Sequence, residues 1–354
     1  MVNIGGEFPL NLCELSNFNS NVQKNLGLED YFVKLFSSGR GALRALLRKI
    51  DRKRALLPSY LCHSVVQAFS TELYDISFYE SIGNGGINVE VLKERLRNVD
   101  VFLIIHYFGF PFKSEILDQI RETCTKLDVV IIEDSTQSIF TTPLFIGDYG
   151  FASLRKWAGI PDGGVAYAKS PLLLEENYSI NDLFCQKRCI GMMQRSIFLA
   201  GIATDYLVHL EYLQRAEELL NNESGIFSIS PLSKSLISSI DFITVKRKRR
   251  ENYKVLFRLL KNTKIEIITP QLTEYECPLF LVIRVARRDY LRSQLAEKGI
   301  FCPVHWPIED DTLLQNQLLK NWTSKVLSIP IDQRYGIQEM KYIAKTLLSI
   351  VNAI

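Results

Sequence analysis

Short apolar runs alternate with amphipathic segments from residue 28 to about residue 170. The apolar runs have the length of buried strands and cover residues 55–57, 76–79, 101–106, 129–132 and 165–168. The amphipathic segments have apolar positions at helical spacing and cover residues 39–50, 62–69, 89–96 and 113–127. Strands that are apolar on both faces need helices on both sides. The alternation therefore predicts an α/β fold with a mostly parallel central sheet.

The pattern changes after residue 170. Residues 171–225 are predicted to be mainly helical, and one long helix is predicted over residues 231–261. Strands at 265–268 and 279–285 and helices at 289–298 and 337–350 follow. These elements predict a large domain over residues 1–244, which includes an N-terminal arm, and a smaller C-terminal α+β domain over residues 245–354.

Composition excludes several classes of protein. The chain has 354 residues, of which 47% are apolar and 23% charged, so wholesale disorder is excluded. A formal net charge of +3 argues against a dedicated nucleic-acid or membrane-surface protein. No apolar run approaches the length of about 18 residues that a membrane span needs. The seven cysteines are odd in number and lie mostly in apolar runs, which is typical of free thiols in a reducing cytoplasm.

Ligands of open α/β sheets bind outside the carboxyl ends of the strands, and Asp134 stands at such an end. It follows the apolar run VVII directly, within VVIIEDSTQS. A helix N-cap or a solvated loop acid would explain an aspartate there. The functional interpretation is a carboxylate that is held at a strand end and stays ionised only beside a cation or several donors.

Lys156 has an unusual setting, within GDYGFASLRKWAGIPDGG. A lysine can simply cover apolar surface with its stem while its head reaches water. Here small residues and glycines precede it, and PDGG and another apolar strand follow. A backbone this permissive suggests the close approach of something planar and bulky. A lysine desolvated in such a place can form a Schiff base.

Residues 38–41, Ser-Gly-Arg-Gly, open the first long predicted helix. They suit either an ordinary N-cap or an anion-binding turn aided by the helix dipole. The segment is neither a Walker A loop nor a GxGxxG dinucleotide fingerprint. The four histidines show no metal spacing, and Cys185 and Cys189 have no second pair at zinc spacing, so no metal site is expected.

Taken together, these segments resemble the DegT/DnrJ/StrS sugar aminotransferases, a group of fold-type I pyridoxal phosphate enzymes. The resemblance runs over nearly the whole chain. Its segments here are SSGRGALRALL, LLPSYLCHSVVQAF, IIHYFGFP, IIEDSTQS, GDYGFASLRKWAGIPDGGVAY, GIFCPVHWP and VLSIPIDQRYG. The pairing of EDxxQ with S…K…GG is its most specific part. The resemblance implies the aspartate aminotransferase-like fold, with a large domain that binds the cofactor and a smaller C-terminal domain.

The resemblance also implies pyridoxal 5'-phosphate (PLP) as the cofactor. Lys156 would hold it as a Schiff base and later move a proton between substrate and cofactor. Asp134 would pair with the ring nitrogen and keep it protonated, so that the ring acts as an electron sink. Gln137 would lie near the ring face or the phenolic oxygen.

The remaining cofactor contacts are implied for two further groups of residues. Phosphate binding would fall to Ser38, Gly39, Arg40 and Ser153, with arginine at the position where the family usually has threonine. The family's ring-stacking aromatic falls at residues 61–62, which are Leu and Cys here. Tyr60 or His63 would take its place.

The implied activity is transfer of an amino group from an amino acid, glutamate in this family, to a keto-sugar that can be nucleotide-linked, in a homodimeric enzyme. Two departures motivate an alternative. Residues 225–233 read GIFSISPLS where many members have GYNxRM, and Ser153 stands three residues before Lys156 rather than five. The alternative is a non-catalytic or differently reacting relative that binds a sugar nucleotide or a partner protein. The presence of both Asp134 and Lys156 favours the enzyme.

Overall fold

The computed structural model describes residues 2–10, 21–81, 86–142, 147–175, 177–202, 205, 207–310 and 313–353. Its central sheet has seven strands in the order β2-β8-β7-β6-β5-β3-β4. Their bounds are β2 (Phe32–Phe36), β3 (Arg54–Pro58), β4 (Asp75–Tyr79), β5 (Val101–Ile105), β6 (Val130–Asp134), β7 (Tyr149–Ser153) and β8 (Gly164–Ala168). The five strands β3 to β7 run parallel, and β8 pairs antiparallel with both β7 and β2. The predicted mostly parallel sheet is confirmed.

Helices connect these strands, as the alternating pattern predicts. They are α2 (Gly39–Lys49), α3 (His63–Thr71), α4 (Val89–Leu96) and α5 (Ser114–Leu127). Each of the five residues of β5 is buried, so both faces of the sheet centre are covered. A short helix, α1 (Val22–Leu26), precedes β2. Because parallel strands bring their carboxyl ends to one edge, residues that follow β3, β5 and β6 gather there.

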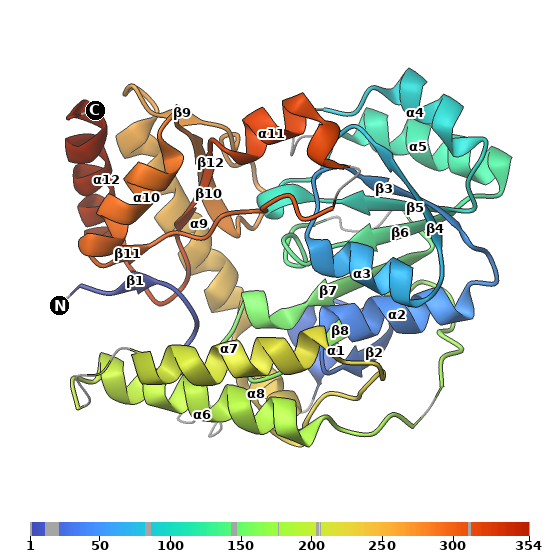
Figure 1. Ribbon diagram of the computed structural model, residues 1–354, viewed down its shortest axis with the longest axis horizontal. Helices are drawn as coiled ribbons and strands as arrows, with labels where there is room; N and C mark the ends of the chain where they lie inside the picture. The colour runs from blue at the N-terminus through green and yellow to red at the C-terminus, as the bar shows by residue number, and fades with distance from the viewer. Residues whose placement is uncertain are drawn as a thin grey trace.

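A pair of helices follows β8. Within the part predicted to be mainly helical, α6 (Asp182–Leu199) and α7 (Leu207–Asn221) pack along each other, as Figure 1 shows at the bottom of the molecule. Residues 231–261 were expected to form one helix, which is wrong, since the structure has α8 (Pro231–Ser239) and α9 (Phe242–Leu260). Ile240 is extended, and the Asp241 carboxylate accepts hydrogen bonds from the backbone N–H groups of Ile243 and Thr244. A polar cap thus starts a new helix inside an unbroken helical pattern.

The C-terminal part lies at the left of Figure 1. It contains a three-stranded antiparallel sheet, β12-β10-β9, with β9 (Glu266–Ile267), β10 (Phe280–Arg284) and β12 (Val326–Pro330). The helices α10 (Arg288–Glu297) and α12 (Ile337–Asn352) lie beside it, and α11 (Gln317–Thr323) lies nearer the central sheet. Near the N-terminus, β1 (Ile4–Gly5) pairs with β11 (Ile300–Phe301), so the first residues attach to this part. The boundary predicted after residue 244 falls inside α9.

Candidate functional site

A cavity of about 320 Å³ opens at the carboxyl edge of the central sheet. Eight of the nine residues proposed from the sequence line it: Ser38, Gly39, Arg40, His63, Asp134, Gln137, Ser153 and Lys156. We call it the lysine cavity. Asp134 ends β6, Ser153 ends β7, and Lys156 ends the short 3₁₀ turn Leu154–Lys156 that follows. The strand β7 lies between the acid and the amine in the chain. Residues from distant parts of the chain therefore meet in one place.

Asp134 is buried at the wall of this cavity with 7% of its surface exposed. The backbone N–H of Thr136 donates to its Oδ1 at 2.8 Å. No salt bridge to Asp134 occurs among the described residues. Burial raises the pKa of this carboxyl group, and its hydrogen bonds to Thr136 offset only part of that effect. The site thus holds an acid whose ionised form lacks a paired cation, which suits a cationic ligand.

Thr136 was not proposed from the sequence, yet it links the acid to the lysine turn. Its Oγ1 accepts a hydrogen bond from the Ser153 backbone N–H at 3.1 Å. Its carbonyl oxygen accepts one from Nε1 of Trp157, next to Lys156, at 2.8 Å. These contacts fix the turn that bears Lys156 against the end of β6. The side chain of Lys156 is itself exposed to the cavity and has no salt bridge among the described residues.

An anion-binding turn lies at the start of α2. Ser38 is its N-cap, and the Ser38 hydroxyl accepts a hydrogen bond from the Gly41 N–H at 2.9 Å. Gly39 packs directly on β7, because a Cβ there would lie 3.0 Å from both N and Cβ of Ser153. The N-cap interpretation therefore holds, and the same turn brings the first amides of α2 next to Ser153. Free N–H groups and the helix dipole at such an end favour an anion.

Arg40 is held by the end of α7. Its guanidinium donates to the Leu220 carbonyl and to Oδ1 of Asn221, both at 2.9 Å. Burial lowers its pKa. Its side chain still lines the lysine cavity, so a positive charge faces the same space as the start of α2.

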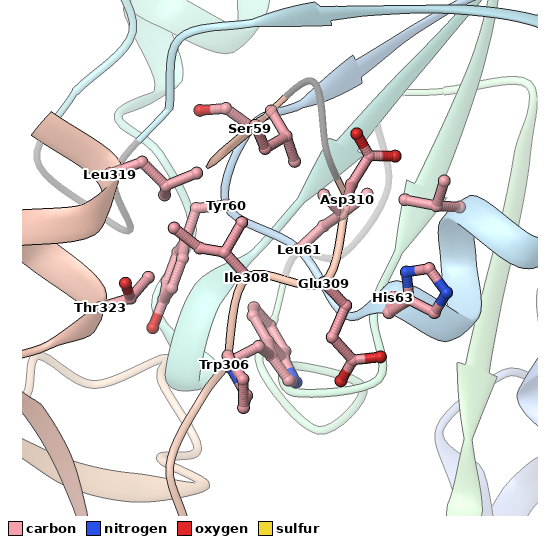
Figure 2. A pocket seen from close by; sticks show the side chains of 13 residues that line it. Ser59, Tyr60, Leu61, His63, Trp306, Ile308, Glu309, Asp310, Leu319 and Thr323 are labelled. Atoms are coloured by element: carbon pink, nitrogen blue, oxygen red, sulfur yellow. The ribbon is translucent and has the colours of Figure 1, made fainter. Parts of the chain in front are cut away.

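Two more proposed residues, Gln137 and His63, differ in the hydrogen bonds that they make. The Oε1 atom of Gln137 accepts a hydrogen bond from the Phe108 N–H at 2.6 Å, which leaves its NH₂ group for another partner. His63 begins α3, and its buried Nδ1 has no hydrogen-bond partner within the part of the chain that the structure describes. Figure 2 shows His63 at the start of the helix, with Trp306 and Glu309 opposite it. His63 thus presents an unused polar atom beside the cavity.

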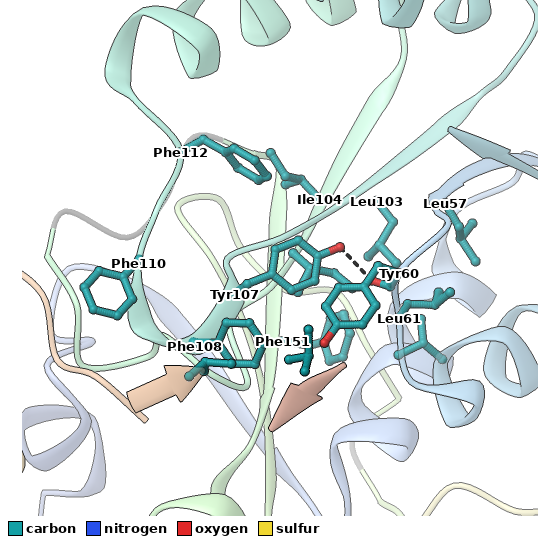
Figure 3. Close-up of a cluster of buried hydrophobic side chains, with 14 of the residues drawn as sticks. Leu57, Tyr60, Leu61, Leu103, Ile104, Tyr107, Phe108, Phe110, Phe112 and Phe151 are labelled. Carbon is teal, nitrogen blue, oxygen red and sulfur yellow. Dashed lines mark hydrogen bonds between the residues drawn. The ribbon is translucent and has the colours of Figure 1, made fainter. Parts of the chain in front are cut away.

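Tyr60 is not among the residues that line the lysine cavity. It is 1% exposed and packs against Tyr107 and Trp306, with ring centroids 5.3 Å and 5.2 Å away. Its hydroxyl donates to the carbonyl of His305. Figure 3 shows Tyr60 within the apolar cluster, where the Tyr107 hydroxyl donates to the Tyr60 carbonyl. Of the two ring-stacking candidates, only His63 lies on the cavity wall.

Besides Thr136, the cavity residues Arg155, Glu217 and His305 were not proposed from the sequence. The Nη1 atom of Arg155 lies 2.6 Å from Oε1 of Glu217 on α7. Burial lowers the pKa of His305 to about 3, so the ring is neutral at pH 7, and its Nδ1 lies 2.8 Å from Oγ of Ser328. His305 lies in the segment GIFCPVHWP, which carries part of the family resemblance. No local sequence signal indicated that α7 is part of the site.

Residues 225–233, which depart from the family pattern, contact their own chain near this site. The Ser37 N–H donates to the Phe227 carbonyl at 2.9 Å. The backbone N–H of Ser230 donates to Oδ2 of Asp162 at 2.8 Å. The segment therefore supports both the turn before α2 and the PDGG turn after Lys156.

Replacing Glu217 with glutamine is expected to lower stability at pH 7 by about 1 kcal/mol, because the ion pair with Arg155 is partly exposed. Burial alone would raise the pKa of Glu217, but the attraction of Arg155 and Arg188 outweighs it and lowers the pKa to about 2. The wild-type pair therefore stabilises fully above the ordinary value of 4.5, and the benefit disappears as pH falls from there to about 2.

Urea unfolding from pH 7 to pH 2 tests this expectation. The glutamine variant should lose less stability over the acid range than the wild type. Glu218→Gln, on the exposed side of the same helix, is the matched control and should follow the wild type. If the free energy of unfolding changes with pH in the same way for Glu217→Gln and the wild type, the Glu217–Arg155 ion pair does not stabilise the protein.

Comparison with family models and with curated proteins finds no match. Solved structures do match over nearly the full length of the chain. Spr1654 from Streptococcus pneumoniae, solved in PLP, PMP and apo forms, has 13% identity and a TM-score of 0.67 for its PMP form, with 99% of this chain and 98% of that chain covered. The same comparison decides the fold class. The chain has the fold of the DegT/DnrJ/StrS aminotransferases.

Two further solved structures of this fold are described as aminotransferases. PseC of Helicobacter pylori, an aminotransferase involved in the biosynthesis of pseudoaminic acid, has 14% identity and a TM-score of 0.67, with 99% and 94% of the chains covered. A DegT DnrJ EryC1 StrS aminotransferase from Brucella abortus has 16% identity and a TM-score of 0.63, with 97% and 91% covered. The fold predicted from the sequence is confirmed.

Within residues 2–10, 21–81 and the later described ranges, no group of three or more metal-binding side chains occurs. In that same part of the chain, the helices are too short or too polar to cross a bilayer.

Proposed function

We propose that the protein is a PLP-dependent aminotransferase that moves an amino group from an amino acid to a keto-sugar. The observation that carries the proposal is the placement of Lys156 and Asp134 on the wall of one cavity. An amine and a buried acid, neither of which has a salt bridge among the described residues, are the two groups that a pyridoxal cofactor requires.

The chain's own residues fit PLP at three points. Asp134, buried and without a salt bridge among the described residues, offers a counter-charge to a protonated ring nitrogen. The first turn of α2 offers amides to a phosphate, and Gly39 makes room for Ser153 beside it. Gln137 lines the same wall, and the buried Nδ1 of His63 has no hydrogen-bond partner among the described residues. We propose Ser38, Gly39, Arg40 and Ser153 as the phosphate contacts.

When bound, the cofactor supplies an electron sink for the carbon that gains or loses nitrogen. Lys156 would anchor the cofactor and then, with its amine released, hold and return a proton at that carbon. Asp134 would keep the ring nitrogen protonated, since an ionised carboxylate in a buried place is stabilised by an adjacent positive charge. Thr136 would act on both groups, because its hydrogen bonds fix Asp134 and the lysine turn together.

The choice of substrate is supported by neighbours of the same fold that are described as sugar aminotransferases, among them CalS13 from Micromonospora echinospora. Glutamate as donor, a nucleotide-linked acceptor, a homodimer and a cytoplasmic location stay predictions from the sequence. The division into two domains at residue 244 also stays a prediction from the sequence.

The decisive experiment is an absorbance spectrum of the purified protein with excess PLP, before and after glutamate is added. We expect a band near the visible edge that falls when glutamate arrives. Reduction with borohydride should leave a cofactor adduct on Lys156. If neither band nor adduct appears, the proposal fails. Binding of a sugar nucleotide without uptake of PLP would then favour the non-catalytic alternative.

Gly39→Ala is expected to weaken PLP binding roughly tenfold, because the new Cβ must displace Ser153 in a packed contact. The measurement is a PLP titration followed by absorbance. Gly41→Ala, in the same turn, is the control, because its Cβ would meet only the Ser38 hydroxyl, at 3.3 Å, with side chains of Phe36 and Ser37 at ordinary distance. Equal PLP affinities for Gly39→Ala and the wild type would rule out this turn as the phosphate site.

A further inference from the structure

His305 lies where the lysine cavity meets a second cavity of about 420 Å³. Its residue surface is 8% exposed, and its side chain lines both cavities. Lys156 also lines both, so the histidine ring and the amine border the same space. The charge of Lys156 adds to burial in lowering the pKa of His305, which places the two groups within electrostatic reach of each other.

Aromatic packing fixes the His305 ring. The ring centroids of Phe280, Trp306 and Phe108 lie 5.0, 5.4 and 6.0 Å from its centroid. The hydroxyl of Tyr60 donates to the backbone carbonyl of the same residue. The imidazole is therefore held from several sides, and its two nitrogens have defined surroundings.

Ser328, in the strand β12, determines which ring nitrogen carries the proton. Its Oγ lies 2.8 Å from Nδ1 of His305 and is 0% exposed with the rest of the residue, so water does not reach it. Within the part of the chain that the structure describes, the Ser328 hydroxyl has no other hydrogen-bond partner. Because a buried hydroxyl that donates to nothing is costly, the hydroxyl donates to Nδ1. The ring is neutral, so its single proton is on Nε2.

The Nε2–H group is thus a neutral donor beside Lys156. Among the described residues it has no hydrogen-bond acceptor. A neutral donor suits an oxygen with partial negative charge, such as that of a carbonyl group. Transamination handles such an oxygen in each half-reaction. A C=O group and an amine become a C=N group and water, or the reverse, and the two hydrogens of that water are those that the nitrogen loses.

We propose that His305 holds the carbonyl oxygen of the oxo substrate through a hydrogen bond from Nε2–H, and that Ser328 is the positioning residue that keeps the proton on Nε2. This inference rests on the proposed function, which supplies the oxo substrate. The hydrogen bond draws electron density from the carbonyl carbon and strengthens as charge develops on the oxygen, so it lowers the barrier to attack by nitrogen.

The kinetic test compares two substitutions of His305. The protein is loaded with PLP, converted with glutamate and freed of product, and 2-oxoglutarate is then added as the probe while the cofactor band returns. His305→Asn can still accept from Ser328 but does not reach the Nε2 position, so the limiting rate should fall roughly 100-fold. His305→Gln places an amide N–H near the Nε2 position and should keep at least about a tenth of the rate. The concentration for half-maximal rate should change less than about threefold in both, since the bond acts mainly in the transition state.

The spectroscopic test follows the proton itself. Nitrogen-15 NMR of the PLP-loaded protein with labelled histidine distinguishes a protonated from an unprotonated ring nitrogen. The signal of His305 is the one that His305→Asn removes or, if that variant does not fold, the one that His305→Gln removes. We expect the proton on Nε2 in the wild type.

Ser328→Ala separates positioning from general stability. It should leave the proton shared between the two ring nitrogens and lower the rate of the 2-oxoglutarate reaction roughly tenfold, the range for loss of one neutral hydrogen bond. Ser324→Ala, which removes an exposed hydroxyl just before the same strand, is the matched control and should keep the spectrum and the rate of the wild type.

Two results would overturn the proposal. One is a wild-type His305 with its proton on Nδ1, and the other is a folded His305→Asn that reacts with 2-oxoglutarate at the wild-type rate. Failure of the proposed function looks different, because absence of a borohydride-trapped cofactor on Lys156 would refute the aminotransferase whatever the histidine spectrum shows. A normal adduct together with either overturning result would refute only the role of His305.

Discussion

Lys156→Ala is expected to abolish covalent attachment of PLP and to reduce the transamination rate by roughly 10⁴-fold or more, since the nucleophile and the proton carrier are lost together. The physical basis is local. Lys156 lines the lysine cavity, and Thr136 fixes its turn against Asp134. The measurements are borohydride trapping with peptide mass spectrometry and the rate of the half-reaction with glutamate.

Two controls show whether this loss reflects chemistry or charge. Lys156→Arg keeps the cation in the cavity but cannot form the carbon–nitrogen double bond, so it should be as inactive as the alanine variant. Lys169→Ala, exposed after β8, should keep the adduct and the full rate. If Lys156→Ala retains a trapped cofactor at another lysine and reacts at the wild-type rate, Lys156 is not the anchor.

The central sheet could be predicted because its strands are buried on both faces. VFLII and VVII are continuous apolar runs, and the strands β5 and β6 lie within one or two residues of the predicted ranges. Helices between them were found through apolar positions at helical spacing, and α4 matches its predicted range of 89–96. Periodicity is reliable where the environment on each side of an element is uniform.

Strands with mixed surroundings were missed. The strand β2 reads FVKLF, carries a lysine at its centre and is largely half-exposed, so it has no clear alternation. YGFAS in β7 contains glycine and serine, because Gly150 faces the ring of Tyr167 and Ser153 faces Gly39. In both cases packing between distant parts of the chain decides the conformation, and no local pattern reports it.

The residues of the candidate site were likewise predictable only where a local sequence signal marks them. Lys156, Asp134 and the start of α2 stand next to strand ends or glycine-rich turns, which are signals that a sequence carries. The contact between Glu217 and Arg155 joins residues 62 positions apart, and Arg40 bonds Leu220 across 180 positions. Such contacts depend on how α7 docks on the cavity. Tyr60 shows the converse, because its aromatic side chain satisfied the pattern but packs away from the cavity.

These contacts give α7 a specific role in this chain. Through Glu217 and its last residues, the helix tethers Arg155, next to Lys156, and Arg40, at the start of α2. Residues 225–233 then support the start of α2 and the PDGG turn. The end of α7 thus lines the site directly, and the segment after it supports two of the site's turns from within the same chain.

Asp134→Asn is expected to lower the transamination rate by on the order of 10²- to 10³-fold, the range for loss of one preorganised electrostatic partner in a buried site. The neutral amide keeps the shape of Asp134 and can still accept from the Thr136 N–H, but it offers no counter-charge to a protonated ring nitrogen. Lysine attachment should persist, because Lys156 is untouched. A half-reaction rate together with borohydride trapping separates the two effects.

The same variant should make the cofactor-free protein more stable at pH 7. Burial raises the folded-state pKa of Asp134 above its ordinary 3.8, so the group stabilises the fold only when protonated. This contribution is fully present below about 3.8 and is lost as pH rises through the folded pKa, which leaves a costly buried charge at neutral pH. Asp148→Asn, a control that removes an exposed carboxylate at the other end of β6, should change neither the rate nor the adduct. If Asp134→Asn destabilises the cofactor-free protein and leaves the rate intact, Asp134 is a structural acid and not the partner of a cationic ring.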